Sequence, residues 1–176
     1  MGLKGGPTQD EVMAVSLAKL GIRPGDRMID VGCGTGKVAI AASRVAGRVY
    51  AIDKRPEAIA CARAQAKDAG AGNIEFFEGD AVDVLAGIDR LDAAFVGGSR
   101  RLPEVLDLLA GKVQGRIVVN AVMVGTLYEA IASMQRLGIF LEAVHLQVSR
   151  SAGIAGGVMF KPINPVYIIV GGAGCS

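Results

Sequence analysis

Three glycines and two aspartates between residues 30 and 53 have the types and spacing of a nucleotide-binding site. The segment DVGCGTG places Gly32, Gly34 and Gly36 two residues apart shortly after Asp30, and Asp53 ends the next apolar run. Glycines permit positive φ angles and let a ligand approach the backbone, because they have no Cβ atom. A carboxylate after the second strand can accept hydrogen bonds from the hydroxyls of a ribose. The pattern therefore predicts a ligand that contains a ribose.

The charge and spacing of this loop distinguish between two nucleotide cofactors. A dinucleotide site carries GxGxxG, and the following helix holds the pyrophosphate. Here the spacing is GxGxG, and Asp30 would repel a pyrophosphate. S-adenosylmethionine instead carries a sulfonium and an ammonium group, which a carboxylate attracts. A third element agrees, since GDA places Asp80 and the backbone of Ala81 where an adenine edge is expected. We therefore favour S-adenosylmethionine; a nicotinamide cofactor, or a tight turn without a ligand, is the alternative.

The elements that must position these residues alternate between strand and helix. Apolar runs predict strands at 27–31, 48–52, 74–79, 91–98 and 115–122. Helical spacing predicts helices at 9–21, 36–46, 56–69, 103–112 and 126–137. Thr8 is expected to cap the first helix in a capping box with Glu11, and Gly21 to end it. After these units, the pattern predicts a long strand at 139–151, a flexible connection at 152–162 and a last strand at 165–172.

This order predicts a single domain over residues 1–176 with an α/β fold. We expect a Rossmann-like three-layer sandwich whose sheet has seven mostly parallel strands and an antiparallel edge strand. Ligands of such sheets bind beyond the carboxyl ends of the strands. The candidate residues of the glycine loop, Asp53, Asp80 and Ala81 follow predicted strands, and Asp30 lies near the end of one, so the fold would bring them to one edge of the sheet.

Composition excludes several other classes of protein. The chain is 51% hydrophobic, but no apolar run reaches the roughly 18 residues that a membrane span needs. A net charge of +2 is too small to indicate nucleic acid as a partner. Three cysteines and one histidine form no metal-binding pattern, so no metal is expected. The cysteine usage and an N-terminus without a signal peptide favour the cytoplasm.

Several motifs follow one another in an order typical of one enzyme family. They are GPTQDEV, DVGCGTGKVAIAAS, VYAIDKRPEAI, GDA, FVGGS, GRIVVNAV and PINPV. On these motifs, which span nearly the whole chain, the sequence resembles the cobalt-precorrin-6B carbon-15 methyltransferase (decarboxylating) family of cobalamin biosynthesis. The resemblance implies methyl transfer from S-adenosylmethionine to carbon-15 of a tetrapyrrole, with loss of carbon dioxide from the ring-C acetate. It also implies a homo-oligomer, a tetramer, for which the late strands are the candidate contacts.

The resemblance also assigns positions in the cofactor site. They are Thr8, the loop residues Gly32, Cys33, Gly34, Thr35 and Gly36, then Asp53 and Ala81. The chain departs from the family at Gly125, where relatives often have glutamate, so any role of that glutamate in substrate binding is absent or moved.

The substrate is expected over the ends of the fourth and fifth strands. The candidates there are Gly97, Gly98, Ser99, Arg100, Arg101 and Asn120. The glycines leave room for a flat ligand, and Arg100, Arg101, Arg150 and Lys161 are cations that suit a substrate rich in carboxylates. Asn120 serves equally well as a substrate ligand or as a satisfied core amide, and His145 on a late strand is more often structural. No catalytic acid or base is identified.

Two other functions remain open at this point. A methyltransferase acting on RNA or protein would share the cofactor loop, although no NPPY-type motif and no cysteine after the fourth or fifth strand supports base methylation. A nicotinamide-dependent oxidoreductase would share the fold alone.

Overall fold

The computed structural model describes residues 8–98 and 100–172. The helices are α1 (Asp10–Leu20), α2 (Lys37–Ser43), α3 (Pro56–Asp68), α4 (Ala81–Ala86), α5 (Leu102–Lys112) and α6 (Val124–Arg136). The strands are β1 (Arg27–Val31), β2 (Arg48–Asp53), β3 (Ile74–Glu78), β4 (Leu91–Val96), β5 (Val113–Ala121), β6 (Phe140–Leu146), β7 (Ser149–Ile154), β8 (Gly157–Pro162) and β9 (Val166–Gly172).

The central sheet confirms the predicted α/β fold. Its seven strands have the order β3-β2-β1-β4-β5-β9-β6, and the first five in this order pair in parallel. Strands β1 to β3 form one half of the sheet, and the chain then crosses over to begin the other half with β4, which lies next to β1. The switch point of the sheet is therefore between β1 and β4, beside the glycine loop. The antiparallel pairing lies at the predicted end of the sheet, where β9 is one position in from the edge strand β6.

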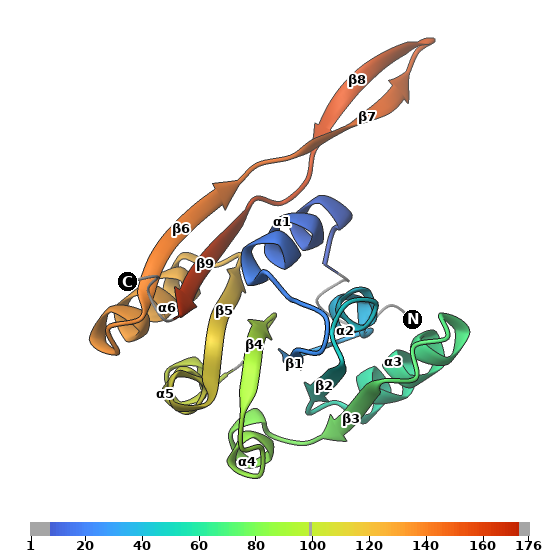
Figure 1. The fold of residues 1–176 in the computed structure, drawn as a ribbon. Coiled ribbons are helices and arrows are strands. Elements are labelled where there is room, and N and C mark those ends of the chain that lie inside the picture. Colours follow the sequence, from blue (N-terminus) through green and yellow to red (C-terminus); the bar gives the residue numbers. More distant parts are fainter. Residues whose placement is uncertain (1–7, 99, 173–176) are drawn as a thin grey trace.

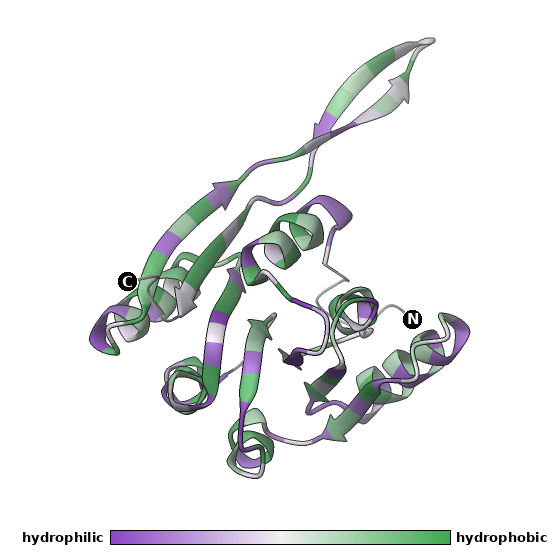
Figure 2. Ribbon diagram, in the orientation of Figure 1, coloured by the Kyte–Doolittle hydropathy of each residue, from purple (hydrophilic) through white to green (hydrophobic). Residues whose placement is uncertain are grey.

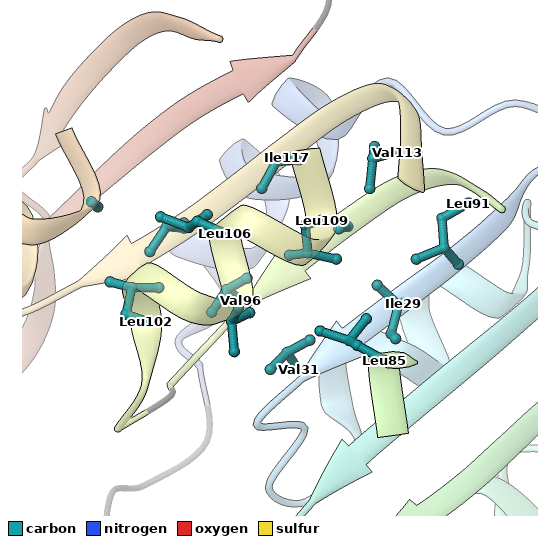
Figure 3. Packing of buried hydrophobic residues seen from close by; sticks show 14 of the residues in the cluster. Ile29, Val31, Leu85, Leu91, Val96, Leu102, Leu106, Leu109, Val113 and Ile117 are labelled. Carbon is teal, nitrogen blue, oxygen red and sulfur yellow. The ribbon is translucent and has the colours of Figure 1, made fainter. Parts of the chain in front are cut away.

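Helices cover both faces of this sheet, as Figure 1 shows. One face packs against α4, α5 and α6, with Leu85, Leu106 and Met134 completely buried. The opposite face packs against α1, α2 and α3. Figure 3 shows Ile29, Val31 and Val96 directed from the strands toward the helices of the first face. Strands that are buried on both sides need apolar residues at nearly every position, which explains why their sequence shows runs and not alternation.

The ends of several helices differ from the prediction. The first helix is capped by Gln9, not by Thr8, and no side-chain cap bond forms there. Gly21 does end that helix, in the left-handed conformation with φ of 62°. Helix α4 was not predicted at all, because its six residues are too few to show a helical period.

The largest error of the prediction concerns residues 147–162. In place of a flexible connection, β7 and β8 form a two-stranded antiparallel sheet of their own. The strand predicted at 139–151 is correspondingly divided between β6 and β7. Figure 1 shows this hairpin projecting from the body of the molecule. Glycines and alanines gave these residues a weak strand signal, and the turn at Ala155–Gly156, with φ of 45° and 79°, closes the hairpin.

Candidate cofactor and substrate site

The glycine loop lies between β1 and α2, and its conformation requires glycine. Gly32, Gly34 and Gly36 have φ angles of 76°, 56° and 79°. The N–H groups of Gly32 and Cys33 donate to the Ile52 carbonyl oxygen at 2.8 and 2.9 Å, which fastens the loop to the end of β2. Residues with a Cβ atom disfavour these positive φ values. The backbone conformation of the turn therefore explains why glycine stands at these three positions.

Cys33 contributes its backbone to this loop and not a reactive thiol. Its side chain is buried, and burial raises the pKa of the thiol well above its ordinary value, with Asp30 and Asp53 adding to the effect. A thiol of this kind stays protonated and is a poor nucleophile. Thr35 lies half-buried in the same turn.

The loop after β4 closes against the glycine loop. The Gly97 N–H donates to the Val31 carbonyl oxygen at 2.9 Å. A Cβ atom placed on Gly32 would lie 2.4 Å from the Gly98 carbonyl oxygen, a distance that real structures do not tolerate. The structure thus brings Gly97 and Gly98, expected at the substrate end, into direct contact with the loop expected to hold the cofactor. Ser99 lies outside the described residues.

Adding one methyl group at this contact should disrupt it. We expect Gly32→Ala to lower the free energy of unfolding by about 2 kcal/mol, from overpacking against Gly98 and from the left-handed φ. Urea denaturation measures this change. Gly98→Ala is the matched control, because a Cβ atom there has no described atom within 4 Å. Equal stability of the Gly32 variant and the parent would contradict the close contact.

Asp53 lies at the end of β2 and is surrounded by donors. Its side chain is only 4% exposed. The Gly34 N–H donates to Oδ2 at 3.0 Å, and the Arg55 N–H donates to Oδ1 at the same distance. The Arg55 guanidinium adds bonds from Nε to Oδ1 at 2.9 Å and from Nη2 to Oδ2 at 2.8 Å. Burial raises the pKa of Asp53, but these hydrogen bonds outweigh it and hold the pKa below its usual range.

Asp30 is buried beneath the glycine loop, and this position alters its expected role. It is 1% exposed, and its Oδ2 accepts the Ala39 N–H at 3.0 Å, so it stabilises the first turn of α2. Oδ1 has no hydrogen-bond partner among the described residues. Burial, together with the charge of Asp53, raises the pKa of Asp30 to about 7. At neutral pH the carboxylate is therefore only partly ionised, and a cation arriving nearby would favour the ionised form.

The adenine region predicted at Asp80 and Ala81 forms the start of α4. Asp80 is its N-cap residue, and its Oδ1 accepts the Val82 N–H at 3.0 Å. The Gly79 N–H donates to the Asp53 carbonyl oxygen at 3.1 Å, so this turn lies next to the predicted ribose site. Arg101 Nη1 lies 3.5 Å from Asp80 Oδ1, and the same guanidinium also pairs with Glu104. The ends of β1, β2, β3 and β4 thus supply one continuous set of candidate residues.

Lys37 was missed by the sequence analysis, although it directly follows the glycine motif. Its Nζ donates to the Thr8 carbonyl oxygen at 2.7 Å and lies 2.6 Å from Asp10 Oδ1. The start of α1 is therefore attached to the first turn of α2. This contact places Thr8 near the cofactor loop through its backbone and not as a helix cap.

The other substrate candidates are placed less favourably. The Asn120 side chain faces α1, where Nδ2 lies 3.0 Å from Ser16 Oγ, which agrees with a satisfied core amide. Arg150 pairs with Glu11, with Nε 2.8 Å from Oε1, and connects the base of the hairpin to α1. Arg100 and Lys161 are exposed. The rings of His145 and Tyr167 stack with centroids 4.5 Å apart, a structural arrangement at the sheet edge.

The part of the chain that the structure describes has neither a candidate metal site nor a candidate membrane-spanning helix. Within residues 8–98 and 100–172, no group of three His, Cys, Asp or Glu side chains is arranged to hold a metal ion. Among these same residues, no helix combines the length and the apolar surface needed to cross a bilayer.

The sheet order, the switch point at β1 and the glycine loop joined to an acidic residue at the end of β2 define a Rossmann-like protein of the methyltransferase class. The family model of the precorrin methyltransferase domain matches residues 4–171. The chain belongs to this family, which confirms the resemblance seen in its motifs.

Individual relatives agree with this membership. A Methanosarcina acetivorans protein named cobalt-precorrin-6B C(15)-methyltransferase (decarboxylating) is 49% identical over 97% of this chain and 96% of its own. The crystal structure of a Methanobacterium thermoautotrophicum precorrin-8w decarboxylase matches with a TM-score of 0.92 and 35% identity, covering 96% of this chain and 92% of that one. A Geobacter metallireducens precorrin-6y C5,15-methyltransferase gives a TM-score of 0.93 at 32% identity, covering 98% and 94%.

Proposed function

We propose that this chain, as one domain over residues 1–176, transfers a methyl group from S-adenosylmethionine to carbon-15 of a cobalt-precorrin and releases carbon dioxide from the ring-C acetate. The observation that carries the proposal is the contact between the glycine loop and the Gly97–Gly98 turn. This contact places the proposed cofactor loop directly beside the end of β4, where the substrate is expected. Membership of the precorrin methyltransferase family supports the choice of a tetrapyrrole substrate.

The residues present suit S-adenosylmethionine. Asp53 would bind the ribose, and the Asp80–Ala81 turn would bind the adenine. The methionine part would lie against the backbone of the loop, with Thr8 nearby; the loop residues are Gly32, Cys33, Gly34, Thr35 and Gly36. The Asp30 oxygen that has no partner within the described part of the chain fits a cationic ligand better than a pyrophosphate, because a phosphate would meet a buried carboxylate there. When bound, S-adenosylmethionine supplies an electrophilic methyl group on its sulfonium.

The protein's own work would be positioning and the exclusion of water. A reduced tetrapyrrole has enamine-like carbons that are nucleophilic without a strong base. When the ring-C acetate loses carbon dioxide, the electron pair of the broken carbon–carbon bond flows into the conjugated ring, and a proton from solvent completes the methyl group that remains on ring C. Gly98, where a Cβ atom would have no described atom within 4 Å, leaves space for the ring, whereas Gly97 packs against Phe95 and Gly32. Arg100 and Arg101 are the candidate partners for the carboxylates of the substrate. Neither a metal nor a general base is needed in this scheme.

The mass of the product tests the proposal. Incubation with S-adenosylmethionine and cobalt-precorrin-6B should give a product that has gained one methyl group and lost one carbon dioxide. A product methylated without decarboxylation would contradict the assigned reaction. Calorimetric binding of NAD, with no binding of S-adenosylmethionine, would instead favour the oxidoreductase alternative.

We also propose that the protein acts in the cytoplasm as a homo-oligomer, a tetramer, with the β7–β8 hairpin in its interface. Ile154, Val158 and Phe160 are 55%, 74% and 69% exposed on this hairpin. Figure 2 shows apolar segments on its strands, away from the helices. A lone two-stranded hairpin is only marginally stable in water, so a second subunit that covers these side chains would stabilise it.

Light scattering measures this association. The parent should have a mass of four chains, and Val158→Ser combined with Phe160→Ser should reduce it, because both changes replace apolar contact surface with hydroxyl groups. The double variant Ser149→Ala with Ser151→Ala, at exposed positions of the same hairpin, is the control. A parent mass equal to one chain would end this proposal.

A further inference from the structure

Asp53 uses its full capacity for hydrogen bonds on donors within the protein. A carboxylate offers about four acceptor positions. From the described residues, Asp53 accepts four bonds, two from backbone N–H groups and two from the Arg55 side chain. The hydroxyls of a ribose could therefore bind Asp53 only by replacing some of these donors.

The four donors differ in how readily a ligand could replace them at Asp53. The N–H groups of Gly34 and Arg55 belong to the backbone of the glycine loop and of the turn before α3, so they stay in place. The Arg55 side chain, in contrast, is 33% exposed, so its guanidinium borders solvent and is not fixed by the backbone. Its Nη2 atom would lie 3.9 Å from a Cβ atom on Gly34, so the guanidinium also covers the glycine loop.

We propose that Arg55 is a resident counter-ion of Asp53, which the ribose diol displaces when the cofactor binds. The proposal rests on the placement of the ribose at Asp53 in the proposed function. In the free protein, the guanidinium compensates a carboxylate that would otherwise be buried with only two donors. In the complex, two neutral hydroxyls take over its bonds, and the charge of Asp53 stays satisfied. Cofactor binding thus exchanges the hydrogen bonds of Arg55 for those of the ribose. This exchange favours ligands that carry both hydroxyls.

The sign of one substitution separates this role from direct binding. If Arg55 must leave, Arg55→Ala removes a competitor and should tighten the binding of adenosine by about fivefold, the value of a partly exposed ion pair. Adenosine is the preferred probe because it is neutral. The loss of the Arg55 charge therefore does not change its affinity through long-range electrostatic attraction or repulsion. Arg55→Lys keeps the charge without the bidentate geometry and should fall between the parent and the alanine variant.

Calorimetry with matched ligands and variants gives the decisive test. The gain for adenosine in Arg55→Ala should vanish for 2′,3′-dideoxyadenosine, which has no hydroxyl to compete with a guanidinium. Lys54→Ala, which removes the adjacent exposed cation, should leave adenosine affinity unchanged. Weaker or equal adenosine binding by Arg55→Ala, while Asp53→Ala still weakens adenosine binding, would overturn the role of Arg55 alone. Unchanged binding by Asp53→Ala would overturn the ribose placement and this inference with it.

Discussion

Asp53→Ala should weaken the binding of S-adenosylmethionine by about 100-fold, since hydrogen bonds to a charged group contribute roughly 1.5–3 kcal/mol each. Asp53 is buried at the end of β2 and is joined to the glycine loop through the Gly34 N–H. The alanine variant therefore loses the proposed contacts to the ribose and one attachment of the loop. Isothermal calorimetry with S-adenosylmethionine and S-adenosylhomocysteine measures both affinities, which should fall together because the two ligands share the ribose.

Glu57→Ala provides the matched control for this prediction. Glu57 is an exposed carboxylate in the first turn of α3, so the substitution removes the same charge close to the site without touching the loop. Its affinity for both ligands should stay near that of the parent. Parental affinity in Asp53→Ala would show that the ribose binds elsewhere.

Asp30→Asn should change how the stability of the protein depends on pH. Burial raises the pKa of Asp30 from an ordinary 3.8 to about 7. Between these values the folded protein binds more protons than the unfolded chain, so this carboxylate lowers the free energy of unfolding as pH rises from about 4 to about 7. A shift of this size corresponds to at most about 4 kcal/mol. Asparagine does not titrate, so the variant should lack this loss.

The comparison between pH values separates this effect from other consequences of the substitution. The asparagine oxygen can still accept the Ala39 N–H, which preserves the first turn of α2. Its amide nitrogen would occupy the position of the unpartnered oxygen, at a cost of roughly 1–3 kcal/mol that does not vary with pH. Urea denaturation of parent and variant at pH 5 and pH 8 measures the difference, and Glu57→Gln controls for the loss of a carboxylate. Stability curves that run parallel would contradict a raised pKa.

The parts of the site that were predicted correctly in position depend on neighbours along the chain. Three left-handed turns require glycines at 32, 34 and 36, and the following helix starts within the same segment. The end of each parallel strand is visible as the end of an apolar run, which placed Asp53, Asp80 and Gly97 at one edge of the sheet. Their roles toward a ligand remain predictions.

Errors arose where weak local signals were decided by distant contacts. The hairpin of β7 and β8 consists largely of residues without a strong strand preference, and pairing across the turn decides its structure. Helix α4 is too short for a helical period, and its start depends on the Asp80 cap. Lys37 gave no signal beyond its place after the glycines, because its partners Thr8 and Asp10 lie just before α1 and at its first residue, far back along the chain.

By itself, the sequence determined the order of the central-sheet strands and of the described helices other than α4, the glycine turns and the family to which the chain belongs, because each depends on residue types at short or fixed spacing. Only the tertiary structure decided that burial raises the pKa of Asp30, that the Arg55 guanidinium hydrogen-bonds Asp53, and that Asn120 bonds with Ser16 across 104 positions of sequence. Burial and hydrogen bonding depend on which elements pack together. Residue types alone do not specify the local dielectric or the partner of a charge.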